Sequence, residues 1–301
     1  MITLIAAAWI SFAPVLTPRQ EVAVAAADGK LYLIGGLAGS DVLSSVEEFD
    51  PATNAWRFVA PLPRPLHHTA AAAVGSSIYV VGGFGTIAFD PQPSVYRYDI
   101  PLDRWTQVAD LPSARGALAA VAIDGLVYAV GGVPGGTDLT VYDPAANAWT
   151  VLPPMPTGRE HLAAAALHGI LFVAGGRIAR NKNAFECYEP GPRRWTSLPP
   201  LPTARGGIAA AALGERIYVF GGEGNPATET GVFAEVESFD FTTFTWRNEP
   251  PMPFPRHGIG AATIGRSIHI PAGALVQGFG TSSVHDALTE EGMGRRRAVR
   301  K

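Results

Sequence analysis

The sequence predicts an all-β protein built from six copies of one repeat. Two observations support this prediction. Tryptophans recur every 44 to 51 residues along the 301-residue chain, at Trp9, Trp56, Trp105, Trp149, Trp195 and Trp246. Double glycines recur with a similar period, at Gly35-Gly36, Gly82-Gly83, Gly131-Gly132, Gly175-Gly176 and Gly221-Gly222. Self-similarity at a period of this length indicates a repeat architecture in which each unit packs on its neighbours.

Each repeat contains the same succession of segments, which predicts four short strands separated by turns. A Pro-rich turn with an arginine is followed by small residues, such as the four alanines Ala70 to Ala73. An apolar run then ends in the glycines, and after a variable loop comes an aromatic, acidic strand. A tryptophan strand and a Pro-rich exit close the unit. The repeated arginines are Arg19, Arg64, Arg115, Arg159, Arg205 and Arg256.

The glycine pairs, the spaced tryptophans and strands such as Tyr142-Asp143-Pro144 resemble the kelch repeat over nearly the whole chain. The resemblance implies a six-bladed β-propeller with four antiparallel strands in each blade. The first strand of each blade then lies nearest the axis, where space is short. We expect alanines there for this reason, although alanine favours helices. Because an arginine occurs in every unit, we expect it to be structural and to tie adjacent blades.

The two ends of the chain predict how the ring closes. Trp9 lies one repeat before Trp56, so a strand near residues 9–13 matches the fourth strand of a blade. The unit formed by about residues 256–290 lacks such a tryptophan strand. We expect the N-terminal strand to complete this last blade and to remove its exposed edge. One propeller then spans residues 1–290, and the basic residues 291–301 form a tail.

Composition limits the functions that the chain can have. A formal net charge of −3 argues against nucleic-acid binding. Cys187 is the only cysteine, which excludes an intrachain disulfide and a cysteine-based metal site. The apolar residues 2–13 are too few to cross a membrane and lack the basic start of a secretion signal. We expect a cytoplasmic monomer without a membrane partner, and secretion is the alternative.

Resemblance to kelch proteins places ligands at one mouth of the central channel. Two loop families build that mouth: the residues one or two places after each repeated arginine, and the residues directly after the glycines. Blades 3 and 5 offer only Gly116-Ala117 and Gly206-Gly207 from the first family. We expect His68 to be a neighbouring strand residue. The predicted ligand-binding residues are Glu21, His67, Glu160, His161, Arg177, Glu223 and His257.

Histidines and glutamates around one axis can bind a metal ion or act as acid and base. We assign no metal and no cofactor. Positions across a mouth are expected to lie too far apart to share one ion, and no spacing such as His-x-x-x-His supports a site. Arg177 suits a carboxylate or a phosphate better.

Three functions stay open, and the last of them is a purely structural or assembly role, which nothing in the sequence tests. The first is a binding module whose mouth loops hold an unidentified protein, a peptide or a small polar ligand. The second is a small-molecule enzyme at the same mouth, because kelch-like rings include sugar-acid mutarotases and metal-dependent lyases. Cys187 lies in a predicted strand, and we expect it to pack there and not to act as a nucleophile. We favour binding, although a fold alone does not fix a function.

Overall fold

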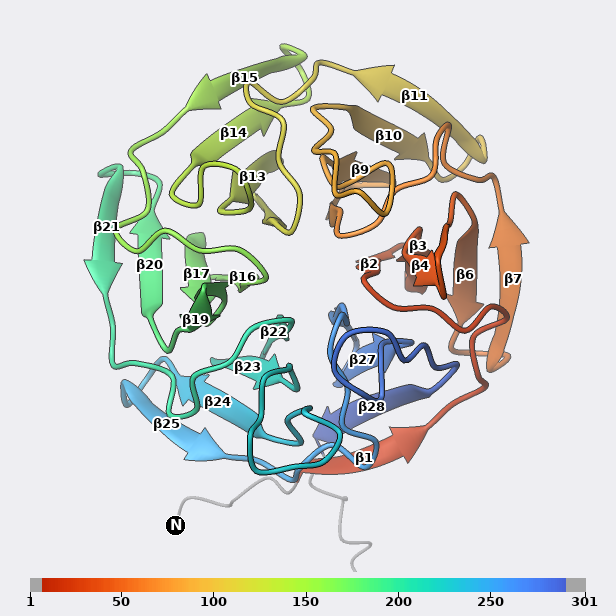
Figure 1. Cartoon of the computed structure of the whole chain (residues 1–301). Coiled ribbons are helices and arrows are strands. Elements are labelled where there is room, and N and C mark those ends of the chain that lie inside the picture. The colour runs from red at the N-terminus through yellow and green to blue at the C-terminus, as the bar shows by residue number, and fades with distance from the viewer. Residues whose placement is uncertain (1–6, 291–301) are drawn as a thin grey trace, which may run out of the picture.

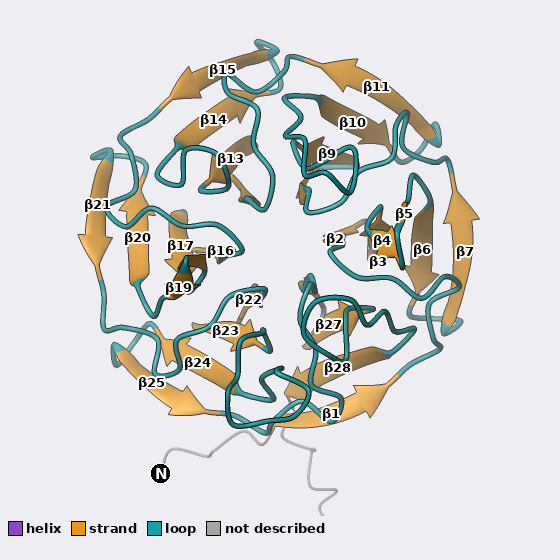
Figure 2. Ribbon diagram, viewed as in Figure 1, coloured by secondary structure: helices purple, strands orange, loops and turns teal. Residues whose placement is uncertain are grey.

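The computed structural model describes residues 7–290, which form a ring of six four-stranded antiparallel sheets (Figure 1). The six-bladed β-propeller expected from the repeats is confirmed. No helix occurs between residues 7 and 290, and teal loops connect the strands throughout the ring (Figure 2). Within these residues, therefore, no helical segment is long and apolar enough to cross a bilayer.

Strands of small residues surround the axis. The alanine run of blade 2 lies in one of them, so it forms a strand and not a helix. Neighbouring inner strands contact each other, and mostly alanines line the channel between them, a cavity of about 450 Å³. Only small side chains let the blades converge this closely. The inner strands are β2 (Ala23–Ala27), β8 (Ala70–Val74), β12 (Ala119–Ile123), β16 (Ala163–Leu167), β22 (Ala209–Leu213) and β26 (Ala262–Ile264).

The other strands follow outward in each blade. The second strands are β3 (Lys30–Ile34), β9 (Ser77–Val81), β13 (Leu126–Val130), β17 (Ile170–Ala174), β23 (Arg216–Phe220) and β27 (Ser267–Pro271). The third strands are β6 (Val46–Asp50), β10 (Val95–Asp99), β14 (Leu139–Asp143), β20 (Phe185–Glu189), β24 (Val236–Asp240) and β28 (His285–Glu290). The outer strands are β7 (Ala55–Val59), β11 (Arg104–Val108), β15 (Ala148–Val151), β21 (Arg194–Ser197) and β25 (Thr245–Asn248), with β1 (Ala7–Ser11) in the last blade. Two minimal hairpins, β4 (Leu37–Ala38) with β5 (Asp41–Val42) and β18 (Arg177–Ile178) with β19 (Arg180–Asn181), shape mouth loops.

The N-terminal strand closes the ring, as expected. Strand β1 pairs with β28 from Ala7 opposite Glu290 to Ser11 opposite Asp286, and Figure 1 shows red β1 beside blue β28. The strand begins two residues earlier than the expected 9–13. The Trp9 indole donates to the Pro250 carbonyl of blade 5 at 3.0 Å, and each other repeat tryptophan likewise bonds to the preceding blade. The expected tail, 291–301, lies outside the described residues.

The repeated arginines tie strands within a blade, which corrects the expectation that their side chains join adjacent blades. The Arg159 guanidinium donates to Glu186 on the third strand at 2.7 Å and to the Val173 carbonyl at 3.1 Å. Arg19, Arg205 and Arg256 form the same kind of pair with Glu47, Glu237 and Asp286, and all are buried. In blade 3, Arg115 bonds to the Thr140 hydroxyl at 2.9 Å instead.

Blade 2 departs from this pattern. Arg64 is exposed, and its place in the blade is taken by the buried Leu66. Tyr96 occupies the position on β10 at which three other blades have a glutamate, and both residues belong to one apolar cluster. An apolar pair has therefore replaced the buried ion pair, and identifying Arg64 as the repeat arginine was wrong.

The glycine pairs leave room for the backbone of the next blade. A Cβ on Gly82, which has a φ of +60°, would lie 2.5 Å from the Arg115 carbonyl oxygen. The N–H of Gly83 donates to that same carbonyl at 2.8 Å. Side chains approach the glycines as well: Leu162 Cδ2 is the atom nearest to a Cβ built on Gly131, and Thr69 Cβ is the nearest for Gly83. Any larger residue at Gly82 would separate blades 2 and 3.

Candidate functional site

A closed ring of six backbone hydrogen bonds forms the hub where the chain enters the inner strands. One residue per blade takes part, two places after the repeated arginine or its substitute Leu66. Each N–H donates to the carbonyl of the equivalent residue in the preceding blade, over 2.7 to 3.0 Å. All six have φ between 49° and 69°, a left-handed conformation that non-glycine residues rarely adopt. The members of this hub ring are Glu21, His68, Ala117, His161, Gly207 and Gly258.

The residue directly before each hub-ring residue forms a second set of six. In every blade this residue pairs with the residue after the glycines through an isolated β-bridge. The two predicted loop families are therefore joined to each other, blade by blade, around the mouth. The pairs are Gln20 with Leu37, His67 with Phe84, Gly116 with Val133, Glu160 with Arg177, Gly206 with Glu223, and His257 with Ala274.

The mouth contains a cavity of about 150 Å³. Five of the seven predicted residues line it, namely Glu21, His161, Arg177, Glu223 and His257. Glu160 lies beside it and lines an adjoining cavity together with His161. The exposed rings of Phe89 and Phe279 form part of its rim.

His68, and not His67, faces the cavity. Because Leu66 holds the arginine position, His68 is the hub-ring residue of blade 2 and His67 is fully buried behind it. The two Nδ1 atoms lie 2.6 Å apart, and His67 Nε2 bonds to the Thr86 carbonyl at 2.9 Å. His68 was missed because Arg64 was taken as the repeat arginine, and this alignment assigned His67 to the mouth. Aligning the segment Leu66-His67-His68-Thr69 with Arg159-Glu160-His161-Leu162 would have found it.

The polar side chains form one continuous chain of contacts around the mouth. Blades 1, 2, 4, 5 and 6 supply them, and blade 3 presents only Gly116 and Ala117 there. The contacts run from His68 to Glu21 (3.2 Å), from Glu21 to His257 (3.5 Å), from His257 to Glu223 (3.5 Å), from Glu223 to Arg177 (2.5 Å), from Arg177 to Glu160 (3.0 Å), and from Glu160 to His161. The His161 ring returns to the His68 ring with a centroid distance of 4.8 Å.

Burial and charge shift the pKa values of these groups in opposite directions. Burial lowers the pKa of His68 to about 3, although the Glu21 carboxylate acts against it. Burial also lowers the pKa of His257, but Glu21 and Glu223 outweigh it and the net shift is upward. For Glu21 burial acts upward, and the imidazoles of His68 and His257 more than compensate, so its pKa falls below the ordinary value. Because His68 is neutral at neutral pH, the positive charge that favours an ionised Glu21 there comes from His257, whose own pKa is raised.

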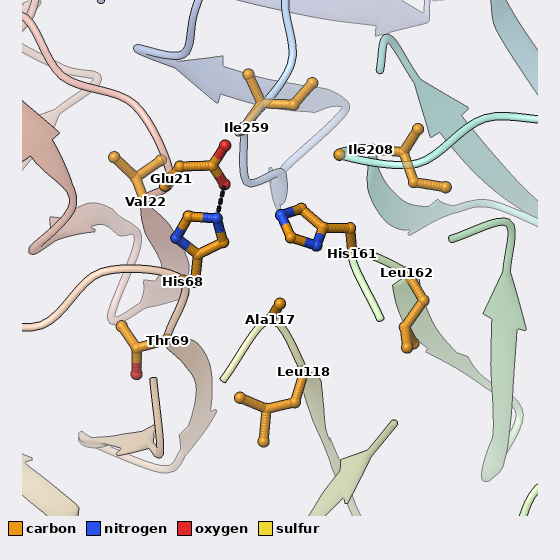
Figure 3. A pocket seen from close by; sticks show the side chains of 12 residues that line it. Glu21, Val22, His68, Thr69, Ala117, Leu118, His161, Leu162, Ile208 and Ile259 are labelled. Atoms are coloured by element: carbon orange, nitrogen blue, oxygen red, sulfur yellow. Dashed lines mark ion pairs between the residues drawn. The ribbon is translucent and has the colours of Figure 1, made fainter. Parts of the chain in front are cut away.

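Three of these residues could hold a metal ion. Glu21, His68 and His161 each offer a ligand atom, and these atoms all lie within 4.8 Å of one another. Figure 3 shows a ring nitrogen of His161 directed at the Glu21–His68 pair. The expectation that residues from different blades lie too far apart to share one ion is therefore wrong for this set.

An apolar cavity of about 400 Å³ adjoins the polar one. Phe84, Phe89, Pro91, Val133 and Pro134 form most of its walls, with Glu160 and His161 between the two cavities. The ring of Phe84 lies where a side chain on Gly116 would stand. A phenyl ring from blade 2 thus occupies the space at Gly116, and blade 3 contributes no polar side chain to the mouth there.

Comparison with known families agrees with this architecture. The family described as the KLHDC2/KLHL20/DRC7 Kelch-repeats domain matches residues 61–222 and 117–285, and the Kelch motif matches residues 18–63. The chain belongs to the kelch-repeat family. The kelch matches together cover five blades and the start of the sixth, which includes both loop families of the mouth.

Individual kelch relatives match over short stretches. The Kelch-like protein terF of Aspergillus terreus (strain NIH 2624 / FGSC A1156) is 42% identical over 57 residues, which are 19% of this chain and 12% of that protein. The F-box/kelch-repeat protein At5g26960 of Arabidopsis thaliana is 44% identical over 41 residues, 14% of this chain and 10% of that protein. These matches span only about a tenth of each curated relative.

A solved structure, that of YjhT, has the same fold. It superposes with a TM-score of 0.76 over 91% of this chain and 96% of that chain, at 15% sequence identity. A likeness at this level of identity concerns the fold. The function of the kelch mouth in this chain has to be argued from its own side chains.

Proposed function

We propose that this kelch propeller is a binding module that holds a small, positively charged ligand group in the mouth cavity. The group is an amine or a guanidine, either free or on a side chain of a protein partner. The observation that carries the proposal is an excess of negative charge. Three carboxylates, those of Glu21, Glu160 and Glu223, meet a single guanidinium, that of Arg177.

Arg177 is not free to bind an anionic ligand. Its guanidinium is engaged by Glu160 on one side and by Glu223 on the other. A ligand carboxylate would have to displace one of them and approach the remaining carboxylates at close range, which is unfavourable at low dielectric. The raised pKa of His257 supplies some positive charge, but that imidazole too lies between two carboxylates. A cation therefore suits the mouth better than the carboxylate that Arg177 suggested from the sequence.

The apolar rim suits the rest of such a ligand. Phe89 and Phe279 border the polar cavity and are 46% and 64% exposed. Aromatic rings at this position can cover the hydrocarbon stem that carries an amine or a guanidine, and a ring face also attracts a cation. Polar floor and aromatic rim together favour a basic group on a short apolar stem.

The proposal is tested by titrating metal-free protein with capped amino acids in a calorimeter. N-acetyl-arginine methylamide and its lysine analogue should bind, and the glutamate analogue should not. Glu223→Gln should weaken the binding of the basic probes about tenfold, equivalent to ~1.4 kcal/mol. Glu215→Gln is the control, because Glu215 is an exposed carboxylate in the turn between β22 and β23, away from the mouth loops.

A second set of probes distinguishes a free ligand from a protein partner. Pentapeptides with a central arginine or lysine bind more tightly than the capped amino acids if a protein segment is the natural ligand. Preferential binding of the glutamate probe would refute the proposal, and so would an unchanged affinity in Glu223→Gln.

Catalysis is the second candidate function, and one observation favours it. The Glu21–His68 and Glu160–His161 pairs face each other at the floor of the cavity, where they could transfer protons to and from one substrate. A sugar-acid mutarotase or epimerase would use them in this way. Polarimetry of a reducing sugar acid tests this function. The wild type should speed the approach to equilibrium, and the variant His161→Asn should not.

A further inference from the structure

The hydrogen bonds of His67 fix the protons on its neighbour. The Thr86 carbonyl can only accept, so the Nε2 of His67 must donate to it over 2.9 Å. In a neutral His67 this leaves Nδ1 with a lone pair. That nitrogen lies 2.6 Å from His68 Nδ1, which must therefore carry the proton of this bond. The Nε2 of a neutral His68 is then left without a proton.

This unprotonated nitrogen faces an acceptor. Glu21 Oε2 lies 3.2 Å from His68 Nε2, and an ionised carboxylate has no hydrogen to donate. Both side chains are buried, and water reaches the pair only from the mouth cavity. Two lone pairs at this separation repel unless a positive species lies between them. His257 does not fill this place, because it approaches the other oxygen of Glu21, Oε1, at 3.5 Å.

His161 directs a third lone pair at the same point. Its Nδ1 contacts the Glu160 carboxylate, which must accept a proton from it, so Nε2 is unprotonated in the neutral ring. Glu160 is in turn held by Arg177 at 3.0 Å. A carboxylate that holds the far nitrogen of an imidazole is the usual outer partner of a metal-binding histidine, and it fixes the ring and raises its basicity.

We propose that Glu21, His68 and His161 bind a divalent transition-metal ion at the floor of the mouth. Two imidazoles and one carboxylate are a ligand set of Zn²⁺ and of non-haem Fe²⁺. The ligands come from blades 1, 2 and 4, and the hub ring fixes their backbones through hydrogen bonds of 2.7 to 3.0 Å. The cavity of about 150 Å³ leaves the remaining coordination positions open to water or a ligand.

This inference deepens the proposed function, on which it rests for the place of the ligand and for the excess of negative charge. It names a metal ion as the cation that the deepest part of the mouth takes. Because an amine and the metal both need Glu21, we expect Zn²⁺ to compete with the basic probes.

The test is a calorimetric titration of untagged, chelator-treated protein with Zn²⁺. We expect close to one ion per chain. His68→Asn and His161→Asn keep the left-handed backbone, which asparagine tolerates, and each should weaken Zn²⁺ binding by at least ~100-fold. Glu160→Gln, which alters only the outer partner, should weaken it ~10- to 100-fold. His168→Asn is the control, because His168 forms an exposed pair with Glu215 in a turn outside the mouth loops.

A spectroscopic titration keeps the test valid if a variant folds poorly. Co²⁺ in the wild-type protein should produce visible absorption bands that Zn²⁺ abolishes, and circular dichroism verifies the fold of each variant. The inference is overturned if the wild type binds no Zn²⁺ saturably, if His168→Asn weakens binding as much as His68→Asn, or if both mouth variants keep wild-type affinity. Failure with Zn²⁺ while the arginine probe still binds removes the metal and leaves the proposed function intact.

Discussion

At the scale of single residues, His269 and His285 show how burial controls charge in this ring. They lie in contact where the last blade meets the first, with His269 Nδ1 3.0 Å from His285 Nε2. The rings of Phe12, Phe49 and Trp56 surround them. Burial lowers the pKa of His269 to about 4; for His285, burial together with the neighbouring His269 lowers the pKa to about 3. Both imidazoles are uncharged in the folded protein at neutral pH.

We predict that this pair makes the protein less stable as the pH falls from 6.5 towards 4. The folded pKa values lie below the ordinary 6.5, so protons bind preferentially to the unfolded chain in this window. Each unit of pKa difference corresponds to ~1.4 kcal/mol, so the free energy of unfolding should decrease by a few kcal/mol. Guanidinium unfolding at pH steps measures the slope, which should be shallower in the variant His269→Asn/His285→Asn. Equal slopes in the two proteins would contradict this account.

The mouth residues could be predicted to different degrees. Glu21, Glu160, His161 and His257 follow a repeat arginine by one or two places, and Arg177 and Glu223 follow glycine pairs, so their spacing together with the resemblance to kelch proteins assigned them to the mouth. His68 could not be located in this way, since Leu66 replaces the arginine and Arg64 offers a false marker two residues earlier. Spacing also gives no side-chain directions. Only the structure shows that the His68 and His161 rings lie 4.8 Å apart.

At the scale of the blade, the buried arginine–acid pairs hold the second and third strands together. Arg159 and Glu186 are both inaccessible to water, so removing one partner leaves an uncompensated buried charge. Such a loss costs ~3–5 kcal/mol, whereas replacing both partners with apolar residues of suitable size can be nearly neutral. Blade 2 provides the natural apolar replacement, with Leu66 and Tyr96 in the corresponding positions.

We therefore predict a strongly non-additive double-mutant cycle. Glu186→Tyr alone should destabilise the protein by ~3–5 kcal/mol, because Arg159 stays charged and buried. Adding Arg159→Leu should recover at least half of this loss by reproducing the pair of blade 2. Chemical denaturation of wild type, both single variants and the double variant measures the coupling. Additive losses would show that the pair of blade 2 depends on its own surroundings.

At the scale of the whole molecule, six inter-blade tryptophan bonds run around the ring without interruption. The one made by Trp9 joins the N-terminal strand to blade 5, and it has the same geometry as the bond of Trp195 to the Pro153 carbonyl at 2.9 Å. The described ring is thus closed by a strand that comes from the opposite end of the chain.

We predict that Trp9→Ala and Trp195→Ala lower the melting temperature by similar amounts. Truncating a packed tryptophan costs ~3–5 kcal/mol, which corresponds to roughly 10 °C in a protein of this size. Deleting residues 1–15 should cost more, because the edge of β28 is then exposed. Differential scanning calorimetry measures all three. If Trp9→Ala left the melting temperature unchanged while Trp195→Ala lowered it, the N-terminal strand would not stabilise the closed ring.

The architecture followed from the sequence because its markers have physical causes that recur in each unit. In five blades a glycine pair stands where the next blade's backbone carbonyl approaches, and in the sixth Ala272-Gly273 stands there. Each tryptophan stands where a blade bonds to its neighbour, so both markers are spaced by one blade. The hub ring of backbone hydrogen bonds has no such marker. It accepts Glu21, His68, Ala117 and glycine alike, because only the backbone takes part.

We infer that this hub ring gathers ligand atoms from separate blades at one point. A long-range ¹H–¹⁵N NMR spectrum of the histidine rings, recorded before and after one equivalent of Zn²⁺, observes these ligand atoms themselves. It should show His68 and His161 protonated on Nδ1 only, and Zn²⁺ should shift the Nε2 signals of these two residues while leaving His269 and His285 unchanged. A His68 ring that carries both protons at neutral pH, or Nε2 signals that Zn²⁺ does not move, would contradict the account.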